Sequence, residues 1–229
     1  MPYNTQQRLD SQKNVELDHE LTVNISKMKQ YLGDSSNIII QSVILDDTET
    51  VFIYISGLID EQKINEIMKT AKIECKHRSQ KEDVFHLLKE MISICVAKEF
   101  TIFDQMIQNL LSGSLIVLVN GCATALSFDI AGGKVRDIAP PQTQTVVRGP
   151  KDSFTESIQI NQSLIRRRLK SPNLRVKSLE IGNISNTTVS VVYLHSIVNF
   201  NFLQIFYNLI QYFWIISPFL IAAKAVHRL

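Results

Sequence analysis

Residues 146–169 read VVRGPKDSFTESIQINQSLIRRRL, and this stretch is the most informative part of the chain. Gly149-Pro150 interrupts the element before it, because proline blocks helix continuation and glycine tolerates unusual backbone angles. Ser153 and Glu156 then form an S-x-x-E capping box, which satisfies the unpaired amides at the start of a helix. The pattern therefore predicts a turn followed by a helix that begins within two residues of Ser153.

The expected helix has an apolar stripe and a basic end. The helical spacing predicts that its inward-facing residues are Phe154, Ile158, Ile165 and Leu169. The last turn carries Arg166, Arg167 and Arg168, where cations oppose the negative end of the helix dipole. Ser171-Pro172 is expected to end the helix, since the residue before a proline disfavours helical angles.

The order of residues in and after this stretch resembles the A subunit of GerA-type spore germination receptors. The resemblance rests on R-G-P-K-D-S-F-T-E from Arg148, on N-Q-S-L-I-R-R-R-L from Asn161 and on S-P-N-L from Ser171. It is clearest from Thr145 to Val198 and is expected to stop near Asn199. Ser153 departs from the pattern, in which glycine is usual, but serine starts a helix at least as well.

The resemblance implies the cytosolic N-terminal region of a receptor A subunit at the spore inner membrane, assembled with B and C subunits and other A subunits. Receptors of this family respond to small nutrients such as amino acids or sugars, at the level of the complex. The implied role is non-enzymatic, in receptor assembly and signal transmission, and it requires no cofactor. By itself, the chain is expected to be soluble or only peripherally attached to the membrane. The alternative is a soluble α/β module that binds a ligand or nucleic acid through its basic second lobe.

A basic block is the candidate binding feature. Residues 148–229 carry ten Lys/Arg and three Asp/Glu, whereas residues 1–147 carry fourteen and nineteen. This asymmetry indicates an anionic neighbour for the second part. The neighbour is either the acidic first part of the same chain, through ion pairs, or a partner subunit or anionic lipid headgroups. Nucleic acid is disfavoured, because consecutive arginines on a helix point about 100° apart and no aromatic stacking pattern accompanies them. The candidate contact residues are Arg148, Lys151, Arg166, Arg167 and Arg168.

The sequence offers no pattern for catalysis or for a metal. Cys75, His77, His86 and Cys95 do not follow a zinc-ligand spacing, and a buried cysteine usually behaves as a small hydrophobe. His195 follows an apolar strand without a recognisable nucleophile motif, so ordinary packing is expected there. The three cysteines, Cys75, Cys95 and Cys122, indicate reduced thiols. The prediction is therefore no catalytic residue and no metal ligand.

The remaining elements predict a mixed α/β fold in two small lobes, each a mixed sheet with packed helices. A helix ended by Gly33 precedes two strands, 38–45 and 51–55, joined at Asp46-Asp47. Helices are expected over 81–97 and 101–111, then a hairpin whose Asn120-Gly121 supplies a type I′ turn. The expected divisions are a disordered N-terminus (1–18), a first α/β subdomain (19–145), the start of a second α/β subdomain (146–199) and an apolar tail (200–229).

The tail differs from the rest of the chain in composition. No charged residue occurs between Glu180 and Lys224, and the tail is rich in Phe, Ile, Leu, Tyr and Asn. An AT-rich gene read out of frame has this composition, so a frameshifted or truncated product is one interpretation. A membrane or interfacial segment and a buried core helix are the others. A shifted frame predicts an isolated helix or substantial exposure of its aromatic side chains, Phe202, Phe206, Phe213, Trp214 and Phe219.

Overall fold

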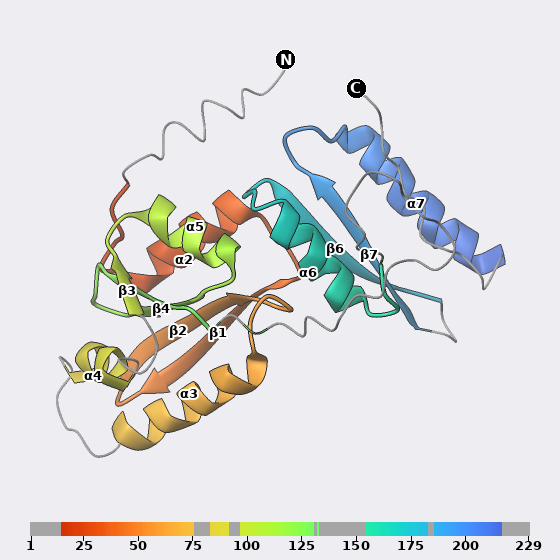
Figure 1. Cartoon of the computed structure of the whole chain (residues 1–229). Helices are drawn as coiled ribbons and strands as arrows, with labels where there is room; N and C mark the ends of the chain where they lie inside the picture. Colours follow the sequence, from red (N-terminus) through yellow and green to blue (C-terminus); the bar gives the residue numbers. More distant parts are fainter. Residues whose placement is uncertain are drawn as a thin grey trace, which may run out of the picture.

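Two antiparallel sheets organise the chain, and they lie side by side in the computed structural model (Figure 1). The structure describes residues 15–75, 83–91, 97–130, 132, 154–182 and 186–216, without the side chains of 83, 91, 97 and 211–216. The elements in chain order are α2 (Leu21–Leu32), β1 (Ile38–Leu45), β2 (Thr48–Ile55), α3 (Glu61–Cys75), α4 (Asp83–Met91), β3 (Ala97–Phe100), α5 (Phe103–Ser112), β4 (Leu115–Val119), β5 (Ala125–Phe128), α6 (Ile158–Arg168), β6 (Leu174–Ile181), β7 (Thr187–Leu194) and α7 (Phe200–Ile216). The mixed α/β class is confirmed, and every pair among the described strands is antiparallel.

The larger sheet has five strands in the order β1-β2-β4-β5-β3. β1 and β2 form a hairpin in full register, from Ile38 opposite Ile55 to Leu45 opposite Thr48. Only Asp46 and Asp47 lie between the strands, with φ of 45° and 60°. Two residues with positive φ are the signature of a type I′ turn, which matches the twist of the strands. The expected turn at this position is confirmed.

The second hairpin turns differently from the prediction. Pairing of β4 and β5 ends at Leu118 and Ala125, so the connection is longer than a two-residue turn. Gly121 has a φ of 91°, but Asn120 is not among the residues with positive φ. Instead, the Asn120 side-chain oxygen accepts a hydrogen bond from the Leu21 backbone amide at 3.4 Å. The backbone amide of Asn120 donates to the Glu49 carbonyl at 2.9 Å. The type I′ prediction at Asn120-Gly121 is wrong, because these bonds hold Asn120 to other elements.

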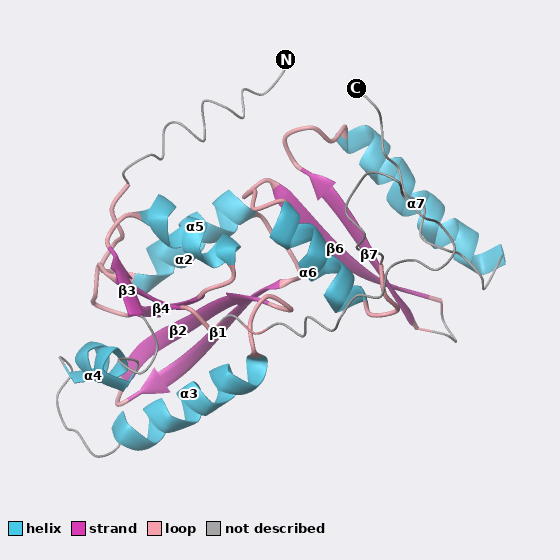
Figure 2. Cartoon of the chain, in the orientation of Figure 1, coloured by secondary structure: helices cyan, strands magenta, loops and turns pink. Residues whose placement is uncertain are grey.

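Helices cover both faces of the five-stranded sheet. Figure 2 shows α2 and α5 on one side of the strands and α3 with α4 on the other. Strands covered on both faces read as continuous apolar runs, and all five residues of β4, LIVLV, are buried. Phe52 in β2 and Phe103 in α5 are among the largest fully buried side chains. The expected helix over 81–97 is shorter, because β3 begins at Ala97.

The described chain begins inside the segment that was expected to be disordered. Leu17 is buried, and its amide donates to the Thr101 carbonyl at 2.8 Å. The Phe103 amide donates to the Val15 carbonyl at the same distance. Residues 15–17 therefore pack beside the chain that follows β3.

The smaller sheet consists of β6 and β7, with a helix on each face. Towards α6 the contact is polar, and the Gln162 amide donates to the Ser190 hydroxyl at 2.6 Å. Towards α7 the contact is apolar, formed by Ile181 and Val191 with two residues of α7, Leu203 and Ile210. The face towards α7 is therefore apolar, whereas the face towards α6 combines this polar contact with buried Leu174 and Val176 of β6.

The start of α6 does not follow the predicted capping box. The helix begins at Ile158, and the Ser157 hydroxyl caps it by accepting from the Ile160 amide. Thr155 and Asn161 exchange two hydrogen bonds of 2.7 Å, which hold the preceding residues in a turn outside the helix. The prediction of a start within two residues of Ser153 is wrong because Ser157 supplies the cap. Ser153, with Gly149 and Pro150, lies outside the described residues.

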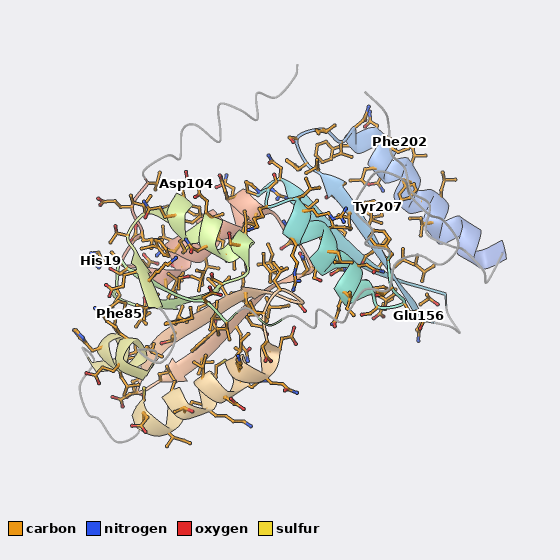
Figure 3. All side chains as sticks on the ribbon, viewed as in Figure 1. His19, Phe85, Asp104, Glu156, Phe202 and Tyr207 are labelled. Carbon is orange, nitrogen blue, oxygen red and sulfur yellow. The ribbon has the colours of Figure 1, made fainter. Side chains whose placement is uncertain are left out.

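The inward face of α6 also differs from the prediction. Phe154 is 64% exposed and Leu169 is 44% exposed, although both were expected to face the core. The residues that α6 buries are instead polar, namely Gln162, Ser163 and Arg166. Glu156 is exposed and lies near the start of the helix (Figure 3).

The tail forms α7, a helix of 17 residues without a charged side chain. It packs on the smaller sheet through Leu203 and Ile210, so it is not an isolated helix. Of the aromatic residues expected to be exposed, Phe202 is 58% exposed, whereas Phe206 is partly buried. The side chains of Phe213, Trp214 and Phe219 lie outside the described residues. Within the described chain, no helix has the length and apolar character needed to cross a membrane.

Candidate functional site at the junction of the two sheets

Arg166 is the centre of the contact between the two sheets. It lies one turn after Gln162 on the inward face of α6, and its side chain is fully buried. Its Nη2 donates to the Leu174 carbonyl at 2.9 Å and to the Asn37 Oδ1 at 3.4 Å. Its Nη1 donates to the Ser171 carbonyl at 3.2 Å. One guanidinium group therefore joins the end of α6, the start of β6 and the residue before β1.

Arg175, in β6, makes a second connection in the same place. It is 6% exposed, and its Nη2 donates to the Tyr31 carbonyl at 3.0 Å. That carbonyl belongs to the last turn of α2, where a cation is favourable because the helix dipole is negative there. The other Nη atom donates to the Pro172 carbonyl. Arg175 thus connects β6 to the end of α2 in the larger half of the molecule.

Gly33 provides the space that Arg175 occupies. Its φ of 64° lies in a region that favours glycine, and its backbone passes directly under the Arg175 side chain. A Cβ atom at position 33 would overlap the Arg175 guanidinium and its Cδ. The glycine predicted as a helix end therefore has a second role, which is to admit the arginine.

The two guanidinium groups are close enough to affect each other. Burial, and then the charge of Arg175, lower the pKa of Arg166 to about 10. Burial also lowers the pKa of Arg175. Both remain protonated at neutral pH, yet within the described chain neither forms an ion pair with a carboxylate. Two buried donors at the junction, the Arg166 Nε and the Asn37 Nδ2, have no hydrogen-bond partner among the described atoms.

A series of hydroxyl and amide groups runs alongside the arginines. The Ser36 amide donates to the Val176 carbonyl at 2.8 Å, and the Val176 amide donates to the Ser35 hydroxyl at 3.3 Å. The Ser36 and Ser178 hydroxyl oxygens are 2.9 Å apart, and Ser178 lies 3.4 Å from Ser190. Together with the bond between Gln162 and Ser190, this series reaches from the start of β1 across the smaller sheet to α6.

A second glycine brings the loop after β2 against α6. Gly57 has a φ of 82°, and a Cβ atom there would lie 3.1 Å from the Gln159 carbonyl oxygen and from the Ser163 Cβ. Two backbone segments, the end of α2 and the end of β2, therefore approach α6 and β6 closely only because glycine is present. The junction is a polar contact with tight packing around it.

A protein family, several longer relatives and a solved structure each match most of this chain. Residues 26–215 match the sequence model of the family described as Bacillus/Clostridium GerA spore germination protein. This chain belongs to the GerA family. The match runs past Asn199, where the resemblance was expected to stop, and takes in almost all of α7.

Relatives within the GerA family are longer than this chain. It is 30% identical over 191 residues to spore germination protein KA of Bacillus subtilis (strain 168), covering 82% of this chain and 35% of that protein. It is 29% identical over 190 residues to spore germination protein GerLA of Bacillus cereus, covering 82% and 38%. The chain therefore spans a little over a third of the length of these relatives.

A solved structure shows the same fold. The N-terminal domain of the A subunit of the Bacillus megaterium spore germinant receptor GerK3 superimposes with a TM-score of 0.69 at 24% identity. The superposition covers 86% of this chain and 73% of that domain. At this identity the similarity supports the fold alone.

The basic block of this GerA-family chain is divided by the structure. Arg166 is buried in the junction, whereas Arg167 and Arg168 are exposed at the end of α6. Arg148 and Lys151 lie outside the described residues. The binding role of the exposed arginines stays a prediction, but Arg166 is not available to an outside partner in this conformation. Sequence reasoning missed Arg175, Gly33 and Asn37 as its companions, because their proximity depends on the packing of the two sheets.

The residues considered for metal or catalysis do not form a site within the described chain. No group of three or more His, Cys, Asp or Glu side chains there could hold a metal ion. Cys75 is buried in the larger core, and burial raises the pKa of the Cys122 thiol. The His195 ring packs edge-on against Phe200, with ring centroids 5.2 Å apart. His77 and the side chain of Cys95 lie outside the described residues.

Proposed function

We propose that this chain is the N-terminal part of an A subunit of a nutrient-germinant receptor in spores. In this proposal it acts in receptor assembly and signal transmission, and it is not an enzyme. Its partners are receptor B and C subunits and other A subunits, and it lies at the cytoplasmic side of the spore inner membrane. A small nutrient acts on the complex as a whole. Membership of the GerA family supports the receptor role.

The observation that carries the transmission role is the arginine junction. Two buried cations, Arg166 and Arg175, bond to neutral oxygens in the other half of the molecule. A guanidinium can exchange one neutral oxygen acceptor for another, whereas separating a buried ion pair leaves two opposite charges without partners. A movement of one sheet is thereby transmitted to the other, because the two arginines can exchange their hydrogen-bond acceptors. Coupling of this kind requires two arrangements of the junction that differ in free energy by a few kcal/mol.

A disulfide across the junction tests the transmission role. The Ser36 and Ser178 hydroxyl oxygens are 2.9 Å apart, so cysteines at both positions are expected to form a disulfide when oxidised. Spores carrying Ser36→Cys with Ser178→Cys in this subunit should lose germinant-triggered germination when oxidised and recover it after reduction. Each single cysteine variant is the control and should respond in both states. An oxidised double variant that germinates normally would contradict transmission through this junction.

Two single substitutions distinguish a role of the buried junction from a role of the exposed positive charge on α6. Arg166→Gln removes the buried cation, whereas Arg167→Gln removes its exposed neighbour on the same helix. We expect the first variant to lose the germination response and the second to keep it. The amount of subunit in the spore membrane, measured by immunoblot, shows whether a loss comes from signalling or from degradation. Equal loss in both variants, with both subunits present, would instead indicate that surface charge carries the function.

A further inference from the structure

Exposed apolar side chains gather at one end of the smaller sheet. Two connections meet there, one from α6 to β6 and one from β7 to α7 (Figure 1). They are joined, because the His195 amide donates to the Asn173 carbonyl at 2.9 Å. Apolar side chains exposed in one place mark an interaction site. Four of the nine exposed large hydrophobic residues of the described chain lie in these connections or in the first turn of α7, namely Leu169, Ile197, Phe200 and Phe202.

Local hydrogen bonds hold these exposed residues in place. The Asn199 side-chain oxygen accepts from the Phe202 amide at 3.4 Å and thereby caps the start of α7. The Ile197 amide donates to the Leu194 carbonyl at 3.1 Å and closes a turn in which Ile197 is 70% exposed. The Leu169 amide makes the last backbone hydrogen bond of α6. The apolar side chains therefore project from hydrogen-bonded backbone, which reduces the entropy that docking would cost.

Positive charge lies beside the same apolar side chains. Arg167 and Lys170 stand on either side of Leu169 in the sequence, and both are exposed. Glu180 is the only acidic residue between residues 157 and 216, and it pairs with Thr188 near the other end of β6. This part of the chain therefore leaves the positive charge unneutralised. We call this surface the basic–apolar edge, and it consists of Arg167, Leu169, Lys170, Ile197, Phe200 and Phe202.

We propose that the basic–apolar edge docks onto the surface of an anionic lipid bilayer. Such a surface offers phosphate groups and, directly beneath them, hydrocarbon, so it complements both parts of the edge. The Arg167 guanidinium can donate two hydrogen bonds to one headgroup phosphate, and Lys170 attracts phosphate as a compact charge. Ile197 and the two phenylalanines then enter the boundary between headgroups and acyl chains.

The make-up of the edge favours lipid over a protein partner. Its apolar side chains come from two connections and a helix start, and a protein would need a fitted pocket for each of them, with acidic groups nearby. A fluid bilayer needs no such pockets. Each cation near an anionic surface raises the binding constant roughly five-fold, so the docking is reversible and sensitive to salt. The proposal deepens the membrane location proposed above, and its test uses the isolated chain, so that its failure would leave the receptor role standing.

Flotation of the full chain with lipid vesicles tests the docking. We expect binding to vesicles made from equal parts of phosphatidylglycerol and phosphatidylcholine. Binding to vesicles of phosphatidylcholine alone should be weaker by about ten-fold or more, and added salt should weaken the first binding. Equal binding to both vesicles would contradict the role of charge. Absence of binding to either would overturn the proposal and leave a protein partner as the occupant of the edge.

Substitution of exposed apolar residues locates the contact on the chain. Ile197→Ser combined with Phe202→Ser should weaken vesicle binding by about ten-fold or more, because both side chains leave the hydrocarbon boundary. The control is Ile73→Ser combined with Phe154→Ser, which removes an exposed isoleucine and an exposed phenylalanine elsewhere. Circular dichroism should show both variants folded, since none of the four side chains is buried. An equal loss of binding in the control would show adsorption without a defined site and refute the proposal.

Removal of charge tests the basic part of the edge separately. Arg167→Gln combined with Lys170→Gln should weaken binding to the anionic vesicles by about twenty-fold, from roughly five-fold for each charge. Lys63→Gln combined with Lys69→Gln is the control, because it removes two exposed charges from α3 and changes the net charge equally. The control should bind nearly as well as the unaltered chain. Equal weakening in both variants would show that net charge alone drives the binding, and the assignment to this edge would be wrong.

Discussion

The two sheets of this protein illustrate two ways of stabilising a small β-structure. The five-stranded sheet has helices on both faces, and its central strand, β4, is apolar and buried throughout. The two-stranded sheet has an apolar face under α7, and on its other face Ser178 and Ser190 form hydrogen-bond contacts with Ser36 and Gln162. An isolated pair of strands is at best marginally stable in water. The smaller sheet therefore depends on its neighbours, whereas the larger one has a core of its own.

The largest loss of stability is expected from truncating a side chain at the centre of the larger core. Phe52 in β2 is fully buried, and Phe52→Ala should lower the free energy of unfolding by about 3–5 kcal/mol. Val51→Ala in β2 and Val191→Ala in β7 remove the same groups, and the second should cost less because the core of the smaller sheet has few buried residues. Urea titration followed by circular dichroism measures both. Equal costs would contradict the view that the larger sheet holds most of the stability.

The second largest effect is expected at the junction. Arg166→Met keeps much of the side-chain volume but leaves the Leu174, Ser171 and Asn37 oxygens without their donor. We expect a loss of about 2–3 kcal/mol, since each unsatisfied buried acceptor costs roughly 1 kcal/mol or more. Arg167→Met, at the exposed neighbouring position, should stay within about 0.5 kcal/mol. Hydrogen exchange should show that the Arg166 variant loses protection in β6 and β7 before β2 and β4.

The contribution of α7 comes next in size. Leu203→Ala should cost about 2 kcal/mol, the low end for a buried leucine, because α7 leaves its opposite face exposed. Phe202→Ala is the control on that exposed face and should change stability little. Amide exchange in β7 should accelerate in the first variant only. If β7 keeps its protection in both, α7 is not needed for the smaller sheet.

The cap of α6 distinguishes the observed helix start from the predicted one. Ser157→Ala should cost about 0.5–1 kcal/mol, at the low end for a cap because the bond to the Ile160 amide is 3.5 Å long. Ser153→Ala, at the serine of the predicted capping box, should have a smaller effect than Ser157→Ala. Thermal unfolding of the two variants under the same conditions measures this difference in stability. A larger loss of stability with Ser153→Ala would instead support the predicted capping box.

The smallest effect is the response to alkaline pH. Burial, and then the charge of Glu61, raise the pKa of Tyr54 in the larger sheet, and burial with the charge of Tyr193 raises that of Tyr207 in α7. A phenol whose folded pKa is raised loses its proton first in the unfolded chain, so the free energy of unfolding falls as the pH rises above 10. Tyr54→Phe and Tyr207→Phe should each reduce this fall. Urea titrations below and above pH 10 measure it.

Arg166 acts in the opposite direction over the same pH range. Its folded pKa, lowered to about 10, makes the folded chain lose a proton before the unfolded chain does, so stability rises with pH above that value. Each tyrosine variant is therefore compared with the unaltered chain at the same pH. A fall that persists unchanged in both variants would assign the alkaline response to other groups.

Local patterns in the sequence predicted the parts of the fold that depend on neighbouring residues. Two apolar runs with Asp46-Asp47 between them predicted two strands, either a hairpin or neighbours in the sheet, and positive φ at both aspartates is the local cause of the hairpin. Gly33 was expected to end α2, and it does. The family resemblance also followed from local order, from Arg148 through Ser171.

The parts that failed depend on which side chains meet, and the spacing of residue types does not show this. The serine spacing suggested one cap for α6, but Thr155 and Asn161 bond to each other and shift the helix start to Ile158. Arg166 looked like one of three equivalent surface cations. Only the packing of α6 against Asn37 and Leu174 distinguishes it from Arg167. Periodicity cannot show this difference, since a buried arginine and an exposed one have the same letter and the same spacing.

The overlap between position 33 and the Arg175 side chain has a genetic consequence. Two sites far apart in the gene are joined by one steric constraint, because the backbone at Gly33 is open only to hydrogen while a long side chain crosses it. Whether a substitution is tolerated at position 33 therefore depends on the residue at position 175, and the reverse also holds. A lineage that replaces Arg175 with a short side chain relieves the collision at position 33, and alanine there then meets only the cost of its backbone angle. The residue at one of these two positions therefore limits which residues the other can accept.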